Sequence, residues 1–402
     1  MADNSQKNTQ RVQKKRKEKL PRSVFWGRAF LVFLVLLMFI VIAAKSFANV
    51  TFSNIGDSIS SYFESLGSGD GYPFSLNSIS VKDIDMAGSD LLLLSDTKLT
   101  VLDKTAKQRS SIQHTFANPQ MTSNNGLILV YDRGSTNFRL QTKKEVLFEK
   151  DIKEKITTAD VGKKGNFAVA TIGDTTKSVL TVYNSSFNEV FKWNSSSEYI
   201  IAVALSPNGK SVAVATVGAE TGEIYTKISV FDFNKNDPVG TFLYSSTTIV
   251  DLIYTKRNVL VGIGDNLTAV IKNNTVKEAD ISYEAGSLSR YSYNSENGTF
   301  ALFLSKFGSN SSGELRFYGS DASLVFSTDI QSSVRSIDCD SKYVCVLHDN
   351  NISYYNLKGK NMGQIPMKND TQKIFIDGSN TYVSAVSEIR GFSARQAEKE
   401  KD

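Results

Sequence analysis

The sequence predicts an all-β fold: an eight-bladed β-propeller that is preceded by one N-terminal transmembrane helix. Two observations lead to this prediction. An uncharged run of sixteen residues, 29–44, follows a basic tail. After it, a pattern of short strands returns eight times with a period of roughly 40 residues, which is typical of propellers. The predicted parts are a basic cytoplasmic tail (1–28), a transmembrane signal anchor (29–45), a juxtamembrane helix with a glycine-rich linker (46–72), the propeller (73–393) and a charged tail (394–402).

The apolar run is long enough to cross a membrane once. At a rise of 1.5 Å per residue its helix measures about 24 Å, against a hydrocarbon layer of roughly 30 Å. Arg28 and Lys45 at its ends can reach the headgroups, and Trp26 suits the membrane interface. The alternative to an anchor is a signal peptide that is cleaved after the small-x-small motif Ser46-Phe47-Ala48. We favour an uncleaved anchor, because the basic segment and the apolar core are both long for a signal peptide.

The distribution of charge sets the orientation of this helix. Residues 1–28 contain nine Lys and Arg but only two acidic residues, Asp3 and Glu18. The positive-inside rule therefore places the tail in the cytoplasm and the propeller outside it, at the cell membrane. The net charge of the whole chain is +5, and that of the tail alone is +7, so the rest of the chain has a net charge of −2. The basic composition thus gives no reason to expect a nucleic-acid partner.

A dense basic cluster in the tail suits contact with anionic lipid headgroups, an effect of about 1 kcal/mol per basic residue. Its members are Lys14, Lys15, Arg16, Lys17 and Lys19. A role in topology alone is the alternative. After the anchor, apolar residues between Ile55 and Leu66 recur at helical spacing, which predicts a short amphipathic helix that ends at Gly67. The segment GSGDGYP, 67–73, then reads as a flexible joint.

The repeat is clearest between Tyr199 and Ser246. Residues 200–205 read as a strand, SPNGK as a tight turn in which Gly209 takes positive φ, and 211–216 as the next strand. KISVFDF and VGTFLY complete a four-stranded unit. The second strands of the eight units begin at Leu91, Leu127, Phe167, Val212, Val259, Phe300, Tyr343 and Tyr382. Four short antiparallel strands per repeat predict a blade of a propeller.

The eighth unit lacks an obvious fourth strand before the charged tail. The segment around Phe74 to Leu76 can supply this strand and close the ring with N-terminal chain. A seven-bladed ring with one irregular unit is the alternative, and a two-sheet sandwich is less favoured because it needs no repeat. Third strands often end on a small polar residue that suits a turn: Asp103, Asn184, Asp232 and Asn356.

The SPNGK turn between two apolar strands resembles the units of TolB-like and WD-repeat propellers. As a whole, residues 75–392 look like the membrane-anchored propeller proteins of unknown function of Gram-positive anaerobes. The Trp-Asp dipeptides of WD repeats are absent, since Trp26 and Trp193 are the only tryptophans. The same scarcity argues against the quinone-dependent enzymes of the related PQQ-like group, whose units carry a Trp-containing motif. The resemblance implies a fold and a location but no activity.

Signals for catalysis or for a cofactor are weak. The two histidines, His114 and His348, fall in different units, and G-x-S-x-G, P-loop and dinucleotide-binding motifs are absent. The segment DFNKNDPVG from Asp232 resembles the start of a calcium loop, but its twelfth position is Leu243. Cys339 and Cys345 flank a DSK turn that would place them on one face, either as a disulfide or as buried thiols. We therefore expect no catalytic residues, no metal and no cofactor.

The sequence favours a protein-interaction module that binds an envelope protein or a cell-wall component. Two longer insertions, 217–227 and 306–314, join second to third strands and should lie on one face of the ring. The residues proposed for partner binding are Glu220, Glu223, Tyr225, Lys306 and Asn310. An envelope glycan or peptide hydrolase and a ligand-sensing receptor ectodomain are the alternatives.

Overall fold

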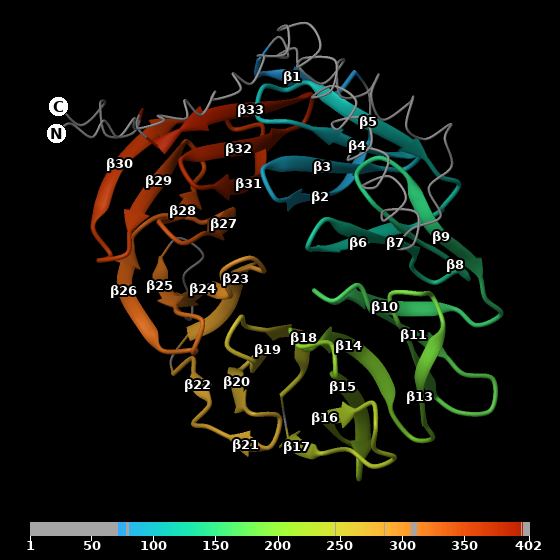
Figure 1. Ribbon diagram of the computed structural model, residues 1–402. Coiled ribbons are helices and arrows are strands. Elements are labelled where there is room, and N and C mark those ends of the chain that lie inside the picture. Colours follow the sequence, from blue (N-terminus) through green and yellow to red (C-terminus); the bar gives the residue numbers. More distant parts are fainter. Residues whose placement is uncertain are drawn as a thin grey trace, which may run out of the picture. The chain divides into compact units, whose positions relative to one another are not determined.

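The computed structural model describes residues 71–77, 80–245, 247–284, 286–306, 312–394 and 396, all of which belong to one compact unit, Ser68–Asp402. These residues form a ring of eight antiparallel sheets (Figure 1). The predicted eight blades are confirmed, and the seven-bladed alternative is wrong. The predicted tail, anchor and juxtamembrane helix lie outside the described residues. Within the described part of the chain, no helix is long and apolar enough to cross a bilayer.

Blades 1 to 4 each contain four strands in sequence order, and the first strand of each lies next to the axis (Figure 1). The strands are β2 (Val81–Ala87), β3 (Asp90–Ser95), β4 (Lys98–Leu102) and β5 (Gln108–Gln113) in blade 1; β6 (Pro119–Asn124), β7 (Leu127–Asp132), β8 (Asn137–Gln141) and β9 (Val146–Asp151) in blade 2; β10 (Ile156–Val161), β11 (Phe167–Ile172), β12 (Ser178–Tyr183) and β13 (Glu189–Ser195) in blade 3; and β14 (Tyr199–Leu205), β15 (Ser211–Glu220), β16 (Glu223–Asp232) and β17 (Gly240–Ser245) in blade 4.

Blades 5 to 8 repeat this plan with two variations. In blade 5 the outer strand is split into two short pieces that both pair with β20, and in blade 8 it comes from the start of the described chain. The strands are β18 (Ile249–Tyr254), β19 (Val259–Gly264), β20 (Leu267–Lys272), β21 (Val276–Lys277) and β22 (Ile281–Ser282) in blade 5; β23 (Gly286–Asn294), β24 (Thr299–Lys306), β25 (Gly313–Tyr318) and β26 (Leu324–Ile330) in blade 6; β27 (Ser336–Cys339), β28 (Tyr343–Leu347), β29 (Asn351–Asn356) and β30 (Asn361–Pro366) in blade 7; and β31 (Thr371–Asp377), β32 (Asn380–Ala385), β33 (Glu388–Ser393) and β1 (Phe74–Ser75) in blade 8.

The ring closes between β1 and β33, as the sequence predicted. Phe74 pairs with Ile389, and the Leu76 amide donates a hydrogen bond to the Ser387 carbonyl at 2.9 Å. Leu76 is 2% exposed and packs in one cluster with residues of blades 1 and 8. The Tyr72 hydroxyl, 3.2 Å from the Asp103 carbonyl oxygen, adds a bond to blade 1. N-terminal chain therefore completes the last blade and covers part of the edge of β33.

The hydrophobic core consists of separate clusters between neighbouring blades. Val344 and Val346 of β28 pack toward blade 6, whereas Cys345 and Leu347 of the same strand pack toward blade 8. Alternate residues of a strand point to opposite faces, so a blade with a neighbour on each side must be apolar on both. This explains why the second strands, such as LLLL in β3 and FAVA in β11, read as continuous apolar runs.

The predicted placement of Cys339 and Cys345 on one face is wrong. Cys339 pairs with Val344, so the turn between β27 and β28 has one residue fewer than the DSK reading requires. A shift of one residue moves a side chain to the other face of a strand. The two cysteines accordingly lie in different clusters, and both are buried free thiols.

The polar residues at the ends of third strands cap the turns that follow. Asn184 Oδ1 accepts hydrogen bonds from the amides of Ser186 and Asn188 at 2.9 and 3.0 Å. Asp103 and Asn356 accept amide bonds in the same way. Asp232, the first residue of the calcium-like segment, accepts the Asn234 amide at 2.9 Å. Such turns satisfy local amides, which is the ordinary role of Asp and Asn at these positions.

Candidate functional site

The ring has two faces, and the one on which second strands join third strands is called the hairpin face below. The insertion 217–227 lies there, but it is not an irregular loop: β15 and β16 continue as a regular hairpin up to Glu220 and Glu223, which pair across a two-residue turn. Thr221 and Gly222 form that turn with φ values of 50° and 89°. This hairpin extension, residues 217–227, is the blade-4 arm. Sequence reasoning missed its regularity because AETGE contains no apolar alternation.

A buried carboxylate fixes the base of the blade-4 arm. Glu198, 3% exposed, accepts hydrogen bonds from Thr216 Oγ1 at 2.5 Å and from the Tyr225 hydroxyl at 3.1 Å, and forms an ion pair with Lys227. These bonds, with Lys227 as the nearby cation, hold the pKa of Glu198 below its usual value despite burial. The Glu198 carboxylate is buried, although the Lys227 side chain is 29% exposed. Loss of a donor would leave a buried acceptor without its partner, so these bonds tie the arm to its blade.

The residues predicted for partner binding divide into three groups. Glu220 and Glu223 are exposed at the tip of the arm, next to Ile224, which is 57% exposed. Tyr225 belongs to its base, through the bond to Glu198. Lys306 ends β24 on the same face, where its Nζ lies 3.3 Å from Asp329 Oδ1. Asn310 and the basic tail cluster (Lys14, Lys15, Arg16, Lys17 and Lys19) lie outside the described residues.

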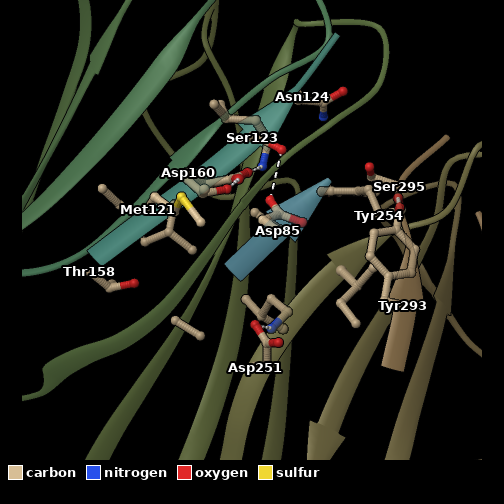
Figure 2. A pocket seen from close by; sticks show the side chains of 18 of the residues that line it. Asp85, Met121, Ser123, Asn124, Thr158, Asp160, Asp251, Tyr254, Tyr293 and Ser295 are labelled. Atoms are coloured by element: carbon tan, nitrogen blue, oxygen red, sulfur yellow. Dashed lines mark hydrogen bonds between the residues drawn. The ribbon is translucent and has the colours of Figure 1, made fainter. Parts of the chain in front are cut away.

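Sequence reasoning also missed a cavity of about 370 Å³ at the axis, the waist cavity, which the first strands of blades 1 to 6 line. Figure 2 shows that Asp85, Asp160 and Asp251 surround it together with Tyr254 and Tyr293. A fourth aspartate, Asp338, has the corresponding place on β27. Asp85, Asp160 and Asp338 occupy the same position on the first strands of blades 1, 3 and 7, whereas Asp251 of blade 5 lies two residues earlier, at the position of Asp83. These four residues are called the waist aspartates. An alignment of the first strands VKDIDM, ITTADV, IVDLIY and SIDCD reveals an aspartate on every second blade, whereas the second strands, on which the repeat was counted, do not.

The waist aspartates join neighbouring blades. Asp160 accepts the Leu205 amide of blade 4 at 2.8 Å and the Thr122 hydroxyl of blade 2 at 3.3 Å. Asp85 accepts the Ser123 hydroxyl at 2.7 Å, a bond that Figure 2 marks. The Tyr291 hydroxyl donates to Asp251 at 3.0 Å. Since inner strands of different blades share no ladder of backbone bonds, these side chains supply polar links around the axis.

Burial raises the pKa of these carboxyl groups. The pKa of Asp160 rises to about 7, with the nearby Asp251 carboxylate as a further cause, and that of Asp251 rises to about 6. The pKa of Asp338 rises to about 7, chiefly because of burial. Raised carboxyl pKa values occur at catalytic sites, but also in structural networks. Here hydrogen bonds to adjacent blades account for the placement of each group.

The two histidines do not join these carboxylates. His114 Nδ1 lies 3.2 Å from the Phe116 amide and its Nε2 lies 3.1 Å from the Ser95 carbonyl oxygen, so the ring bridges two backbone groups. His348 contacts the Ser333 carbonyl oxygen and two serine hydroxyls, those of Ser332 and Ser353. Burial lowers the pKa of both imidazoles. In the described residues, no cluster of three or more His, Cys, Asp or Glu side chains is placed to hold a metal ion.

Several solved structures resemble this chain in fold. The C-terminal WD40 domain of Sif2 matches with a TM-score of 0.57 and 12% identity, over 80% of this chain and 98% of that one. Saccharomyces cerevisiae Sqt1 matches with a TM-score of 0.53 and 11% identity, over 81% of this chain and 100% of that one. BamB from Moraxella catarrhalis matches with a TM-score of 0.51 and 10% identity, over 80% and 100% of the two chains. At such identities the likeness extends to the fold alone.

Sequence comparison is more specific. No curated protein sequence matches the chain. The pattern of a family of unknown function, DUF5711, matches residues 52–388, which includes nearly the whole ring. That match confirms the predicted resemblance to propellers without an assigned activity. The chain belongs to the family of unknown function DUF5711.

Proposed function

We propose that this protein is a single-pass, membrane-anchored interaction module whose propeller lies outside the cytoplasm and binds a partner in the cell envelope through the hairpin face. The observation that carries the proposal is the blade-4 arm. Its base is fixed by Glu198, and its tip presents Glu220, Glu223 and the exposed Ile224 beyond the blade. A rigid scaffold that presents a projecting element is the usual arrangement of a recognition site.

The location rests on the amino-acid pattern of the N-terminal segment. The uncharged run 29–44 and the nine basic residues before it favour an anchor with its tail in the cytoplasm. A propeller on the other side of that membrane meets envelope proteins and cell-wall material. The tip of the arm, with two carboxylates beside one exposed apolar side chain, suits a protein partner that offers basic and apolar groups.

A shortened arm tests this function. Gly218 and Tyr225 pair across β15 and β16, so Asn-Gly in place of residues 219–224 joins them by a tight turn and preserves the bond from Tyr225 to Glu198. In the native cell, a photo-crosslinking residue at position 223 should trap a discrete envelope protein. The same residue at exposed Lys235, in a turn on the opposite face, serves as the control.

Two variants complete the design. Ile224→Ser should reduce the trapped product, whereas Leu357→Ser, which removes an exposed apolar side chain from a turn on the opposite face, should not. A normal thermal unfolding temperature of the shortened variant confirms that the ring is intact. Because the shortened variant lacks position 223, its readout is co-purification of the partner trapped by the wild-type arm. Equal trapping from positions 223 and 235, or unchanged co-purification of that partner with the shortened variant, would refute recognition by this face.

A further inference from the structure

A second cavity, of about 620 Å³, opens on the hairpin face beside the axis, and we call it the mouth cavity. Four successive blades contribute one basic residue each to its lining. These are Arg290 from blade 6, Arg335 from blade 7, Lys373 from blade 8 and Lys82 from blade 1. Figure 1 shows the inner strands of these blades, β23, β27, β31 and β2, as neighbours around the axis.

Three of the four basic residues, those of blades 1, 6 and 8, lie at irregularities near the starts of the inner strands. The register of β2 shifts between Val81 and Asp83, which leaves Lys82 as an extra residue outside the ladder. The same shift occurs on β23 just before Arg290 and on β31 just before Lys373. β-Bulges re-aim side chains, and here they direct cationic side chains from three blades toward one cavity.

Only part of this positive charge is neutralised. Asp83 is the single carboxylate among the described residues of the lining, and its Oδ1 lies 3.7 Å from Lys373 Nζ. Arg335 forms an ion pair with Asp349 at 2.7 Å. Arg290 donates to two backbone carbonyls, of Arg335 at 2.6 Å and of Ser289 at 2.7 Å, which hold the guanidinium without cancelling its charge. Among the described residues, neither Lys82 nor Arg290 has an acidic partner.

The remaining charge is therefore about +2, fixed at the rim of a cavity that also has apolar walls. Val81, Ile337 and Val386 form part of these walls, and Val386 is 68% exposed. A phosphate monoester carries a charge of roughly −1.5 to −2 at neutral pH and offers three acceptor oxygens. Arginine matches such an oxyanion geometrically, and a cavity of several hundred Å³ also admits the organic group that bears the phosphate.

We propose that the mouth cavity binds a phosphate monoester through Arg290 and Lys82. The site does not rest on the blade-4 arm or on the envelope partner proposed above. The described lining of the waist cavity contains Asp85, Asp160 and Asp251 but no Lys or Arg, so that cavity offers an anion no cationic partner and the ligand stays at the mouth. The monoester can belong to a soluble metabolite or to a lipid headgroup, and the chemistry recognised is the same.

The test uses the full-length chain in phosphatidylcholine nanodiscs and titration calorimetry. Glycerol 3-phosphate should bind, and glycerol and acetate should bind at least tenfold more weakly. Lys82→Gln should weaken glycerol 3-phosphate binding about tenfold, and Arg290→Gln by at least as much. Lys235→Gln, which removes one exposed positive charge on the opposite face, is the matched control and should leave the affinity unchanged.

A second experiment distinguishes the two sources of the ligand, a soluble metabolite and a lipid headgroup. Nanodiscs that also contain phosphatidic acid present the same phosphate monoester on a lipid. If its headgroup reaches the site, the apparent affinity for glycerol 3-phosphate falls by competition; if the affinity is unchanged, the site takes the soluble form. Because no hydrogen bond or ion pair joins the Lys82 side chain to another described residue, its variant should keep the wild-type unfolding temperature. Absence of glycerol 3-phosphate binding, or equal binding by wild type and Lys82→Gln, would overturn the proposal.

Discussion

Asp160 on β10 and Asp338 on β27 make equivalent contacts on opposite sides of the ring, in blades 3 and 7. Each accepts a backbone amide from the following blade at 2.8 Å, Leu205 for Asp160 and Ile376 for Asp338. Each also accepts a hydroxyl hydrogen bond from the preceding blade, from Thr122 and from Ser292 respectively. One side chain thus links three successive inner strands, and the ring contains this link twice.

The first prediction is that the contribution of Asp160 to folding stability falls as pH rises, because the charge that forms on this buried carboxyl group is poorly solvated. The pKa of Asp160 is about 7 in the folded chain and about 3.9 when unfolded, so between these values the folded chain binds more protons. Stability therefore falls as pH rises through this window. The asparagine of Asp160→Asn keeps one acceptor for Leu205 and does not titrate. Relative to wild type, this variant should gain on the order of 1 kcal/mol in unfolding free energy from pH 5 to pH 8, measured by denaturant titration.

The control for this prediction is Asp321→Asn. Hydrogen bonds from Ser323 lower the pKa of Asp321, so this group is ionised in both states throughout pH 5 to 8. Its variant should differ from wild type by the same amount at both pH values. A difference between wild type and Asp160→Asn that is independent of pH would show that Asp160 stays ionised, and the link would then be a permanent carboxylate bridge.

The second prediction concerns ring closure. A soluble version that begins at Gly71 contains β1, whereas one that begins at Ser78 lacks it and exposes the edge of β33. The shorter version also loses Leu76, whose burial is worth about 2 kcal/mol, so its unfolding temperature should be lower by several degrees. Differential scanning calorimetry of both versions decides the matter. Equal melting temperatures would mean that blade 8 does not need N-terminal chain.

The overall architecture was accessible from the sequence because a propeller repeats its local pattern. The second strand of each blade was located from apolar runs such as LILVY and VAVAT. The closing strand was inferred because the last unit lacks a fourth strand of its own. The number of blades and the way in which the ring closes could therefore be predicted from the number of repeats and the strands in each. The transmembrane anchor stays a prediction, because residues 29–45 lie outside the described part of the chain.

The candidate sites were harder to predict for two physical reasons. Register decides which face a residue occupies, and a turn shorter by one residue separated Cys339 from Cys345. The sequence also does not show which distant residues come together in space. Lys82 of blade 1 and Arg290 of blade 6 are far apart in sequence and line one cavity only because the closed ring brings blade 1 beside blade 8. The waist aspartates show a weaker form of this limit, because aligned first strands reveal their recurrence but not their contacts.

The third prediction concerns the capped turns between third and fourth strands. Asn184→Ala removes the acceptor of two backbone amides, those of Ser186 and Asn188, and should lower the unfolding free energy by about 1 kcal/mol. Asn184→Asp keeps the acceptor and should stay close to wild type. Asn194→Ala, at an exposed position on neighbouring β13, provides the matched control with little effect. Equal losses at positions 184 and 194 would indicate that the cap contributes nothing beyond the side chain itself.

The last prediction concerns topology and follows from the imbalance of nine basic to two acidic residues in 1–28. External protease on intact, wall-stripped cells should digest an epitope inserted at the exposed Thr221-Gly222 turn and should spare an N-terminal tag, because the tail is expected in the cytoplasm. Detergent lysis is the control and should make the tag sensitive as well. Replacement of Lys14, Lys15, Arg16, Lys17 and Lys19 by Gln should weaken this orientation, since the rule depends on the charge next to the span. A tag that is digested in intact cells would place the propeller in the cytoplasm, and the proposed envelope partner would have to be abandoned.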